Sequence, residues 1–144
     1  MTIHLIKLSV GPETLDDLAA RQKQRLKDMK SKGQKPELMH VTRHMPKRAE
    51  ELLDGGSIYW VIKGWLCARQ KLLELRPLQR DGVSRCGLVY DKELVRVSPR
   101  PHRAFQGWRY LASKDAPRDL DKAAKGAAAM PETLRRELRE LGLM

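Results

Sequence analysis

The clearest strand signal in the chain is Ser57-Ile58-Tyr59-Trp60-Val61-Ile62-Lys63-Gly64. Side chains alternate across a strand, so Ile58, Trp60 and Ile62 share one face while Tyr59 and Val61 share the other. Both faces are apolar, which is typical of a strand covered on both sides. The stretch therefore predicts a central strand, and the glycine that follows predicts a bulge or a sharp bend.

The segments before this strand alternate between strand and helix signals. Residues 3–10 are rich in β-branched and leucine residues and predict a strand. Residues 13–31 repeat their apolar positions with a helical period and predict a long helix. Residues 38–42 predict a short strand. A short helix is expected from Pro46 to the breaker at residues 54–56.

The segments after the central strand are harder to assign. Residues 65–76 fit either a helix or a long bent strand, because their leucines suit both patterns. Residues 80–82 predict a turn. Cys86–Tyr90 and Leu94–Val97 predict a hairpin around Asp91-Lys92. A last strand is expected at 104–111, and a terminal helix from Pro131 to about Leu141.

Short strands in the middle, with helices at the start and end, predict an α+β fold. Consecutive antiparallel strands with a bend at Gly64 would close into a small curled β-barrel or form a strongly curled sheet. The barrel would carry a long N-terminal helix, a short helix before the central strand and a C-terminal helix. We expect residues 1–117 to form a single domain. Residues 118–144 would be an Ala-rich linker and a helix that packs on this domain or extends from it.

Composition excludes several classes of protein. The chain has 144 residues, of which 41% are hydrophobic, as expected for one globular domain. No apolar stretch approaches the ~20 residues of a membrane span, and the N-terminus lacks a signal-peptide pattern. We therefore expect a cytoplasmic protein with no membrane contact. Cys67 and Cys86 form no CxxC pair, which predicts buried thiols.

No motif for a metal, a cofactor or catalysis stands out. His40 and His44 are spaced to meet at one metal only on a helix, yet His40 lies in a predicted strand. Ser57 lies outside any GxSxG frame, and the chain has no P-loop or GxGxxG. We expect a non-catalytic protein with neither metal nor cofactor, although a pairing of Ser57 with His44 or His102 stays an open alternative.

The positive charge is concentrated in the middle of the chain. Residues 57–114 hold 12 Lys/Arg and 4 Asp/Glu, a balance of +8 out of a total of +11. All the tryptophans and tyrosines and the single phenylalanine lie in the same stretch. Phosphate chains with stackable bases favour arginines interleaved with aromatic rings. The pattern predicts RNA binding.

The sharpest candidate surface is residues 94–114, which contain no acidic residue. Its expected RNA contacts are Arg96, Arg100, His102, Arg103, Gln106, Trp108, Arg109 and Tyr110. On a strand there, Trp108 and Tyr110 would share one face and Arg109 the other. The opposing interpretation makes the two aromatics part of the core and the arginines merely solubilising.

A second candidate patch lies at the entry of the short helix, where a helix N-terminus with added cations can bind an anion. Its members are Arg43, His44, Lys47 and Arg48. Two other functions stay open on the sequence alone. One is a pocket or enzyme acting on a small, nucleotide-like ligand, and the other is a protein-interaction module.

Three stretches carry a family resemblance: residues 46–64 (PKRAEELLDGGSIYWVIKG), Ala68-Arg69-Gln70, and residues 100–111 (RPHRAFQGWRYL). They resemble a bacterial family of unknown function and of about this length. The resemblance covers most of residues 1–115 and implies no activity.

A wider resemblance is to the PUA-like superfamily with its ASCH and EVE relatives, whose domains open with a short helix, a glycine turn and an aromatic strand. It implies a small curled barrel, RNA or modified-base binding, and a strand at 65–76. The long helix at 13–31 and the terminal helix depart from that pattern, and no binding residues carry over.

Overall fold

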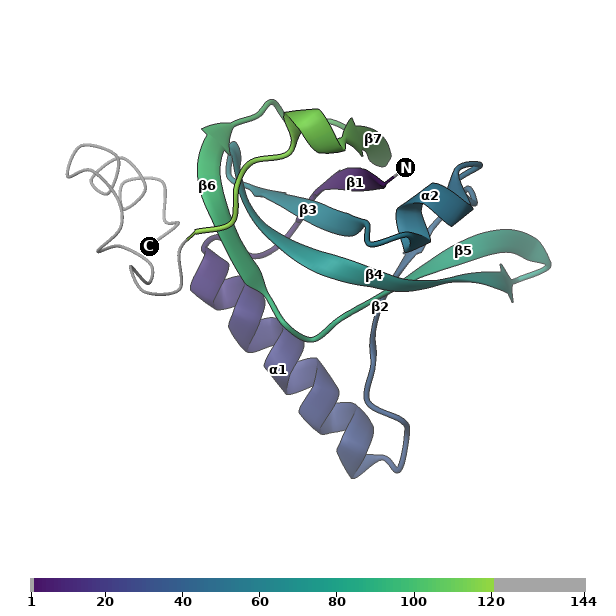
Figure 1. The fold of residues 1–144 in the computed structure, drawn as a ribbon. Coiled ribbons are helices and arrows are strands. Elements are labelled where there is room, and N and C mark those ends of the chain that lie inside the picture. Colours follow the sequence, from purple (N-terminus) through teal and green to yellow (C-terminus); the bar gives the residue numbers. More distant parts are fainter. Residues whose placement is uncertain (1, 121–144) are drawn as a thin grey trace.

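A computed structural model describes residues 2–120 and shows a twisted sheet with one long helix (Figure 1). The predicted C-terminal helix lies outside the described residues. The elements, in chain order, are β1 (Ile3–Leu8), α1 (Leu15–Ser31), β2 (Leu38–Thr42), α2 (Ala49–Leu53), β3 (Ser57–Ile62), β4 (Trp65–Arg80), β5 (Val83–Tyr90), β6 (Val95–Pro101), β7 (Trp108–Ala112) and the 3-10 turn η1 (Ser113–Asp115).

The predicted central strand is confirmed as β3, in which all six residues are buried. The glycine after it is part of a tight turn between β3 and β4, with φ of 50° at Lys63 and 83° at Gly64. Two consecutive residues with positive φ match the twist of a two-residue hairpin. The open question about residues 65–76 is answered in favour of a strand, since β4 runs without interruption from Trp65 to Arg80.

The sheet has seven strands and mixed pairing. β1 pairs parallel with β3 and antiparallel with β7, and the other ladders are antiparallel. The sheet is neither closed nor strongly curled, so the predicted antiparallel barrel or strongly curled sheet is wrong. α1, β2 and α2 separate β1 from β3 in the chain, and a connection of that length allows parallel pairing. Among residues 2–120, β2, β6 and β7 each pair with only one of the named strands, so the sheet does not close on itself.

The predicted hairpin between residues 86–90 and 94–97 is also wrong. β5 and β6 both pair with β4 instead: β5 with the half from Leu72 to Arg80, and β6 with the half from Trp65 to Arg69. The real hairpin is β4–β5, which projects to one side in Figure 1. It turns at Asp81 and Gly82, with φ of 53° and 77°, as the turn prediction required. Asp91 follows β5 and stays beside β4, where its backbone N–H donates to the Lys71 carbonyl at 2.8 Å.

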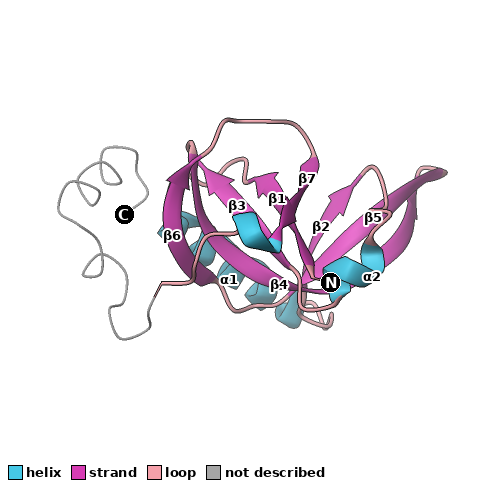
Figure 2. Cartoon of the chain, turned by 45° about the horizontal axis from the view of Figure 1, so that its top comes forward, coloured by secondary structure: helices cyan, strands magenta, loops and turns pink. Residues whose placement is uncertain are grey.

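Each face of β3 packs into its own hydrophobic cluster. Ile58, Trp60 and Ile62 belong to the larger cluster, which α1 completes with Leu15 and Leu18. Tyr59, Val61 and Leu111 belong to the smaller cluster, which lies on the opposite face beside Val97. Figure 2 shows α1 on one side of the sheet, as this division requires. We call the face of the sheet that α1 covers the helix face. We call the opposite face, which the β6–β7 connection covers at Phe105, the strap face.

A fully paired amide network is buried on the helix face. Gln22, the polar residue on the apolar side of α1, exchanges two hydrogen bonds of 2.8 and 2.7 Å with Gln70 of β4. Gln70 Oε1 also accepts from Trp60 Nε1 at 2.9 Å, and its Nε2 donates to the Asp91 carbonyl at 3.0 Å. Gln70 is 0% exposed. Because every group is paired, the network fixes α1 on the sheet without orphaned polar atoms.

The two cysteines agree with the sequence interpretation. Cys67 and Cys86 are both free and buried. Burial raises the pKa of the Cys67 thiol to about 12. Both behave as small apolar core residues.

Candidate nucleic-acid interface

Strand β7 carries two of the predicted aromatic contacts and is held by β1. The antiparallel register places Lys7 opposite Trp108, Leu5 opposite Tyr110 and Ile6 opposite Arg109. Opposed residues share a face, so the two aromatics lie on the helix face and Arg109 on the strap face. The alternation expected from the sequence is confirmed, and it separates the aromatics from the nearest arginine.

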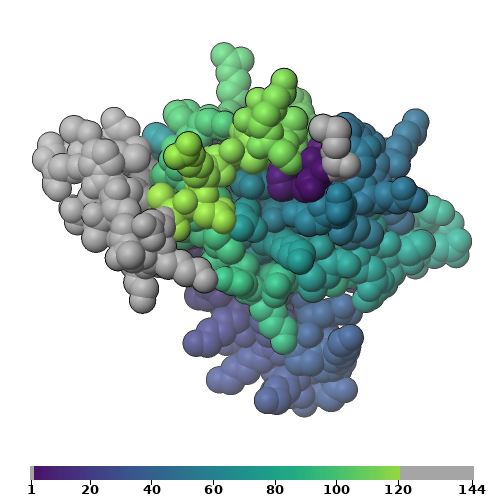
Figure 3. Space-filling view, viewed as in Figure 1, coloured from purple at the N-terminus to yellow at the C-terminus, as the bar shows by residue number. Residues whose placement is uncertain are grey.

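Tyr110 joins the two candidate patches. Its hydroxyl accepts a hydrogen bond of 3.1 Å from the Arg48 backbone N–H, and the Arg48 guanidinium lies 5.6 Å from the centre of its ring. Tyr110 also packs edge-on against Trp108, with ring centres 5.0 Å apart. Figure 3 shows the purple N-terminal residues at the surface between the green β7 region and the blue-teal residues near α2. Segments about sixty residues apart thus form one surface.

The remaining members of the second patch are exposed. Arg43, His44 and Lys47 lie in the loop between β2 and α2. α2 has only five residues, and the side chain of its N-cap residue, Arg48, makes no capping hydrogen bond. A helix of that length has a small dipole, so side-chain charge is what this patch offers to an anion.

On the strap face, the predicted contacts are tied into local structure. The Arg109 guanidinium lies 5.1 Å from the centre of the Phe105 ring, and the His102 ring packs against the same phenylalanine at 5.2 Å. Arg100 Nη1 donates to the Asp115 carbonyl at 2.8 Å. These contacts hold the β6–β7 connection over the smaller cluster.

Three further residues were predicted as contacts. Arg96 pairs with Asp16 of α1 at 3.1 Å, which partly neutralises its charge. Arg103 and Gln106 are exposed in the loop between β6 and β7. The eight predicted contacts therefore divide between two faces and a connecting loop rather than lining one strand face.

Sequence reasoning missed Lys7, which the structure places beside Trp108. Lys7 is half-buried, and its Nζ lies 3.5 Å from the Gly107 carbonyl, to which it donates. Burial lowers the pKa of this ammonium. The available signal was its position, because Ile3, Leu5 and Lys7 alternate on one face of a predicted strand.

A polar pocket of about 350 Å³ opens on the strap face. Its lining includes His4, Ser57, Tyr59, Arg69, Ser113 and Asp119. The Arg69 fork binds the Asp119 carboxylate through Nε and Nη2 and donates to Ser57 Oγ at 3.1 Å through Nη1. Residues 118–120 also add to β6, with Ser98 N–H donating to the Arg118 carbonyl at 2.7 Å.

The histidine of this pocket is arranged as a donor. The Ser57 backbone N–H donates to His4 Nδ1 at 3.0 Å, so the proton of the neutral ring is on Nε2. Nε2 lies 3.3 Å from Ser113 Oγ, and this hydroxyl donates to the Thr2 carbonyl at 2.8 Å. Burial and the charge of Arg69 lower the pKa of His4. His4 thus donates to Ser113 and does not accept its proton, which argues against a base-activated serine here.

Residues 2–120 contain no cluster of three or more His, Cys, Asp or Glu side chains that could hold a metal ion. None of the helices in that range is long and apolar enough to cross a membrane.

A family model described as "Protein of unknown function (DUF1489)" matches residues 5–144. The chain belongs to the DUF1489 family. This confirms the resemblance to a family of unknown function. Searches of curated proteins and of solved structures each found no significant match to this DUF1489 chain, so they lend the PUA-like resemblance no support.

Proposed function

We propose that this protein binds RNA without catalysing a reaction, through one surface that joins the two basic patches. We call it the joined surface, and its members are Arg43, His44, Lys47, Arg48, Trp108 and Tyr110. The supporting observation is the contact of Tyr110 with Arg48, which brings an aromatic pair beside a basic loop. Stacking rings next to cations are the combination that single-stranded nucleic acids bind.

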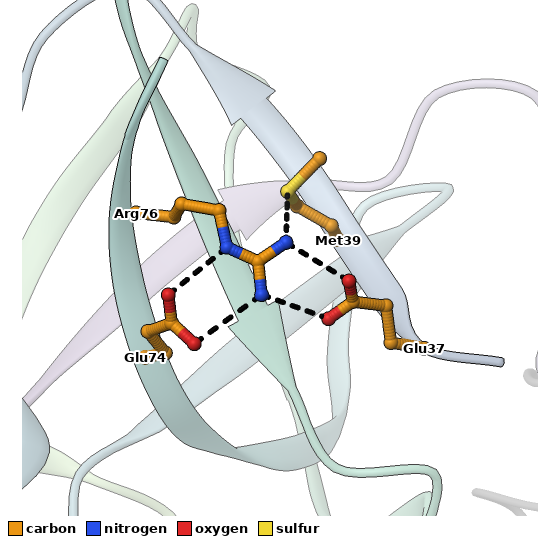
Figure 4. A network of polar contacts seen from close by, with 4 residues as sticks. All are labelled: Glu37, Met39, Glu74 and Arg76. Carbon is orange, nitrogen blue, oxygen red and sulfur yellow. Dashed lines mark hydrogen bonds and ion pairs between the residues drawn. The ribbon is translucent and has the colours of Figure 1, made fainter. Parts of the chain in front are cut away.

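The charge on this surface is available to phosphates. Among residues 2–120, neither Arg43 nor Lys47 lies within 4.0 Å of a carboxylate, whereas Arg48 pairs with Glu51. Arg76 shows the contrasting case (Figure 4): its guanidinium binds Glu37 on one side and Glu74 on the other. A fork paired with two carboxylates has little charge left for a phosphate. Arg76 is therefore structural, and the loop before α2 offers binding charge.

The aromatic pair supplies a stacking position. Tyr110 is 36% exposed, and Trp108 is half-buried behind it. The edge-on packing fixes the orientation of the tyrosine ring before any ligand arrives. A rigid, exposed ring loses little conformational entropy on binding, and stacking contributes roughly 1–3 kcal/mol per base.

Arginines at the end of β6, in the β6–β7 loop and in β7 extend the proposed surface. Arg100, Arg103 and Arg109 have no carboxylate within 4.0 Å among the described residues. We propose that they add long-range attraction and flanking phosphate contacts. The cytoplasm is the compartment we expect for this function.

Two other functions have weaker support from the same structure. A small ligand in the strap-face pocket would have to compete with Asp119, which already occupies the Arg69 fork. A protein-interaction module would use the same exposed surface with a shallower dependence on salt.

The test is fluorescence anisotropy of a labelled single-stranded RNA with three double variants. K47A/R48A removes charge from the joined surface, and R100A/R103A removes charge from the end of β6 and the loop that follows it. K27A/K30A removes the same charge from the exposed side of α1 and serves as the matched control. We expect K47A/R48A to weaken binding most and K27A/K30A least. Equal losses in all three folded variants would contradict a defined surface.

A further inference from the structure

Three neighbouring strands place a lysine between two tryptophans on the helix face. The parallel ladder of β1 with β3 pairs Lys7 with Trp60, and the antiparallel ladder of β1 with β7 pairs Lys7 with Trp108. Paired residues share a face, so the three side chains form a row across the sheet. Trp60 is 4% exposed and forms the inner end, whereas Lys7 and Trp108 are half-buried and can be reached from solvent.

The ammonium of Lys7 has no charged partner among residues 2–120. Its contact there is the Gly107 carbonyl, 3.5 Å away, which is a long hydrogen bond. Removing a cation partly from water without a counter-ion costs free energy. A bound anion would offset that cost, so the half-buried ammonium of Lys7 favours the binding of an anion at this row.

His40 of β2 packs on the inner tryptophan of this row. Its ring packs edge-on against Trp60, with centres 6.2 Å apart. Burial, then the positive charges of Lys7 and of Arg25 on α1, lower the pKa of His40 to about 4. Tyr90 of β5 also packs on Trp60 at 5.7 Å. At neutral pH the imidazole is uncharged and offers one donor and one acceptor.

We propose that Lys7 and His40 form a binding position for the phosphate of a nucleotide, whose base packs on the exposed side of Trp108. Lys7 supplies charge, and His40 donates a hydrogen bond. Trp60, fixed by Gln70, orients His40 from behind. This inference rests on the proposed RNA binding and names the nucleotide-sized position within it. Lys7 continues the joined surface through Trp108.

The first experiment follows the His40 ring by NMR in the free protein. Because the charge of Lys7 lowers the pKa of His40, K7Q should raise that pKa, while K71Q on exposed β4 should leave it unchanged. Inorganic phosphate and uridine monophosphate should each raise it in the wild type, since an anion stabilises the protonated ring. If the pKa of His40 is unchanged both in K7Q and on addition of phosphate to the wild type, the proposed position is overturned.

The second experiment titrates uridine monophosphate and inorganic phosphate into wild type, K7Q, K7R and K71Q. We expect K7Q to weaken nucleotide binding at least about tenfold, as the loss of a hydrogen bond to a charged group does, with K7R largely restoring it. Tighter binding of the nucleotide than of phosphate supports the base contact with Trp108. Equal nucleotide affinities of K7Q and K71Q overturn the inference, and if wild-type RNA binding persists they leave the proposed function intact. Failure of wild type to bind RNA counts against the proposed function instead.

Discussion

Replacing Gln70 with leucine should reveal how much the buried amide network stabilises the protein. The substitution keeps a similar volume but removes four hydrogen bonds. It leaves the Trp60 indole N–H and the Gln22 amide buried without partners, whereas the carbonyl of half-buried Asp91 can turn to water. At roughly 1–3 kcal/mol for each buried orphan, we expect Q70L to lose about 2–6 kcal/mol of unfolding free energy.

Q22L provides the matched comparison. In that variant Gln70 still accepts a hydrogen bond from Trp60 and donates one to the Asp91 carbonyl. Gln70 loses only the two hydrogen bonds that it exchanged with Gln22. Q22L should cost less than Q70L. The double variant Q22L/Q70L removes both amides at once and should cost less than the sum of the two single changes, because the orphaned Gln22 amide is gone.

The assay is urea unfolding, monitored by tryptophan fluorescence and by circular dichroism, of wild type, Q22L, Q70L and Q22L/Q70L. Strict additivity, or a Q70L variant as stable as wild type, would refute the reasoning. Either result would mean that water satisfies these groups and that the network does not hold α1 on the sheet.

Three further predictions concern the core and the strap face. Trp60→Ala should cost roughly 3–5 kcal/mol in urea unfolding as a core truncation, and an unchanged midpoint would place Trp60 outside the core. Cys67, whose pKa is raised to about 12, should resist iodoacetamide in the folded protein at pH 9 and react once urea unfolds it; rapid alkylation when folded would contradict its burial. The side-chain hydrogen bond from Arg69 lowers the pKa of Asp119, so that pair should stabilise the fold above the ordinary aspartate pKa of about 3.9 and lose its effect as pH falls through the lower folded value. D119N should flatten this acid-range dependence of stability, and an identical pH profile for D119N and wild type would rule the contribution out.

Local pattern was enough to predict much of the fold. Alternating apolar residues on both faces identified β3, and helical periodicity identified α1, because both signals come from burial of neighbouring side chains. The pairing of β4 was not accessible in this way. One strand of 16 residues serves β3, β5 and β6, and such partners are chosen by long-range contacts that no local period records.

The candidate surface was predictable in composition and not in geometry. Interleaved charge and aromatics marked residues 94–114, but strand alternation placed Trp108 and Arg109 on opposite faces. The meeting of Tyr110 with Arg48 depends on β7 adding to the outer edge of β1, a pairing across most of the chain. Lys7 was missed because a single lysine in a short strand has no motif.

The central claim is that the joined surface binds RNA through phosphate contacts and stacking. Its most direct test is the affinity of wild type, K47A/R48A and Y110A for a single-stranded RNA across a series of salt concentrations. We expect wild-type affinity in the micromolar range at low salt, falling steeply as salt rises. K47A/R48A should flatten the slope by about one for each phosphate that the variant no longer binds, and Y110A should weaken binding with the slope unchanged. No wild-type binding at low salt, or binding that does not depend on salt, would contradict the account.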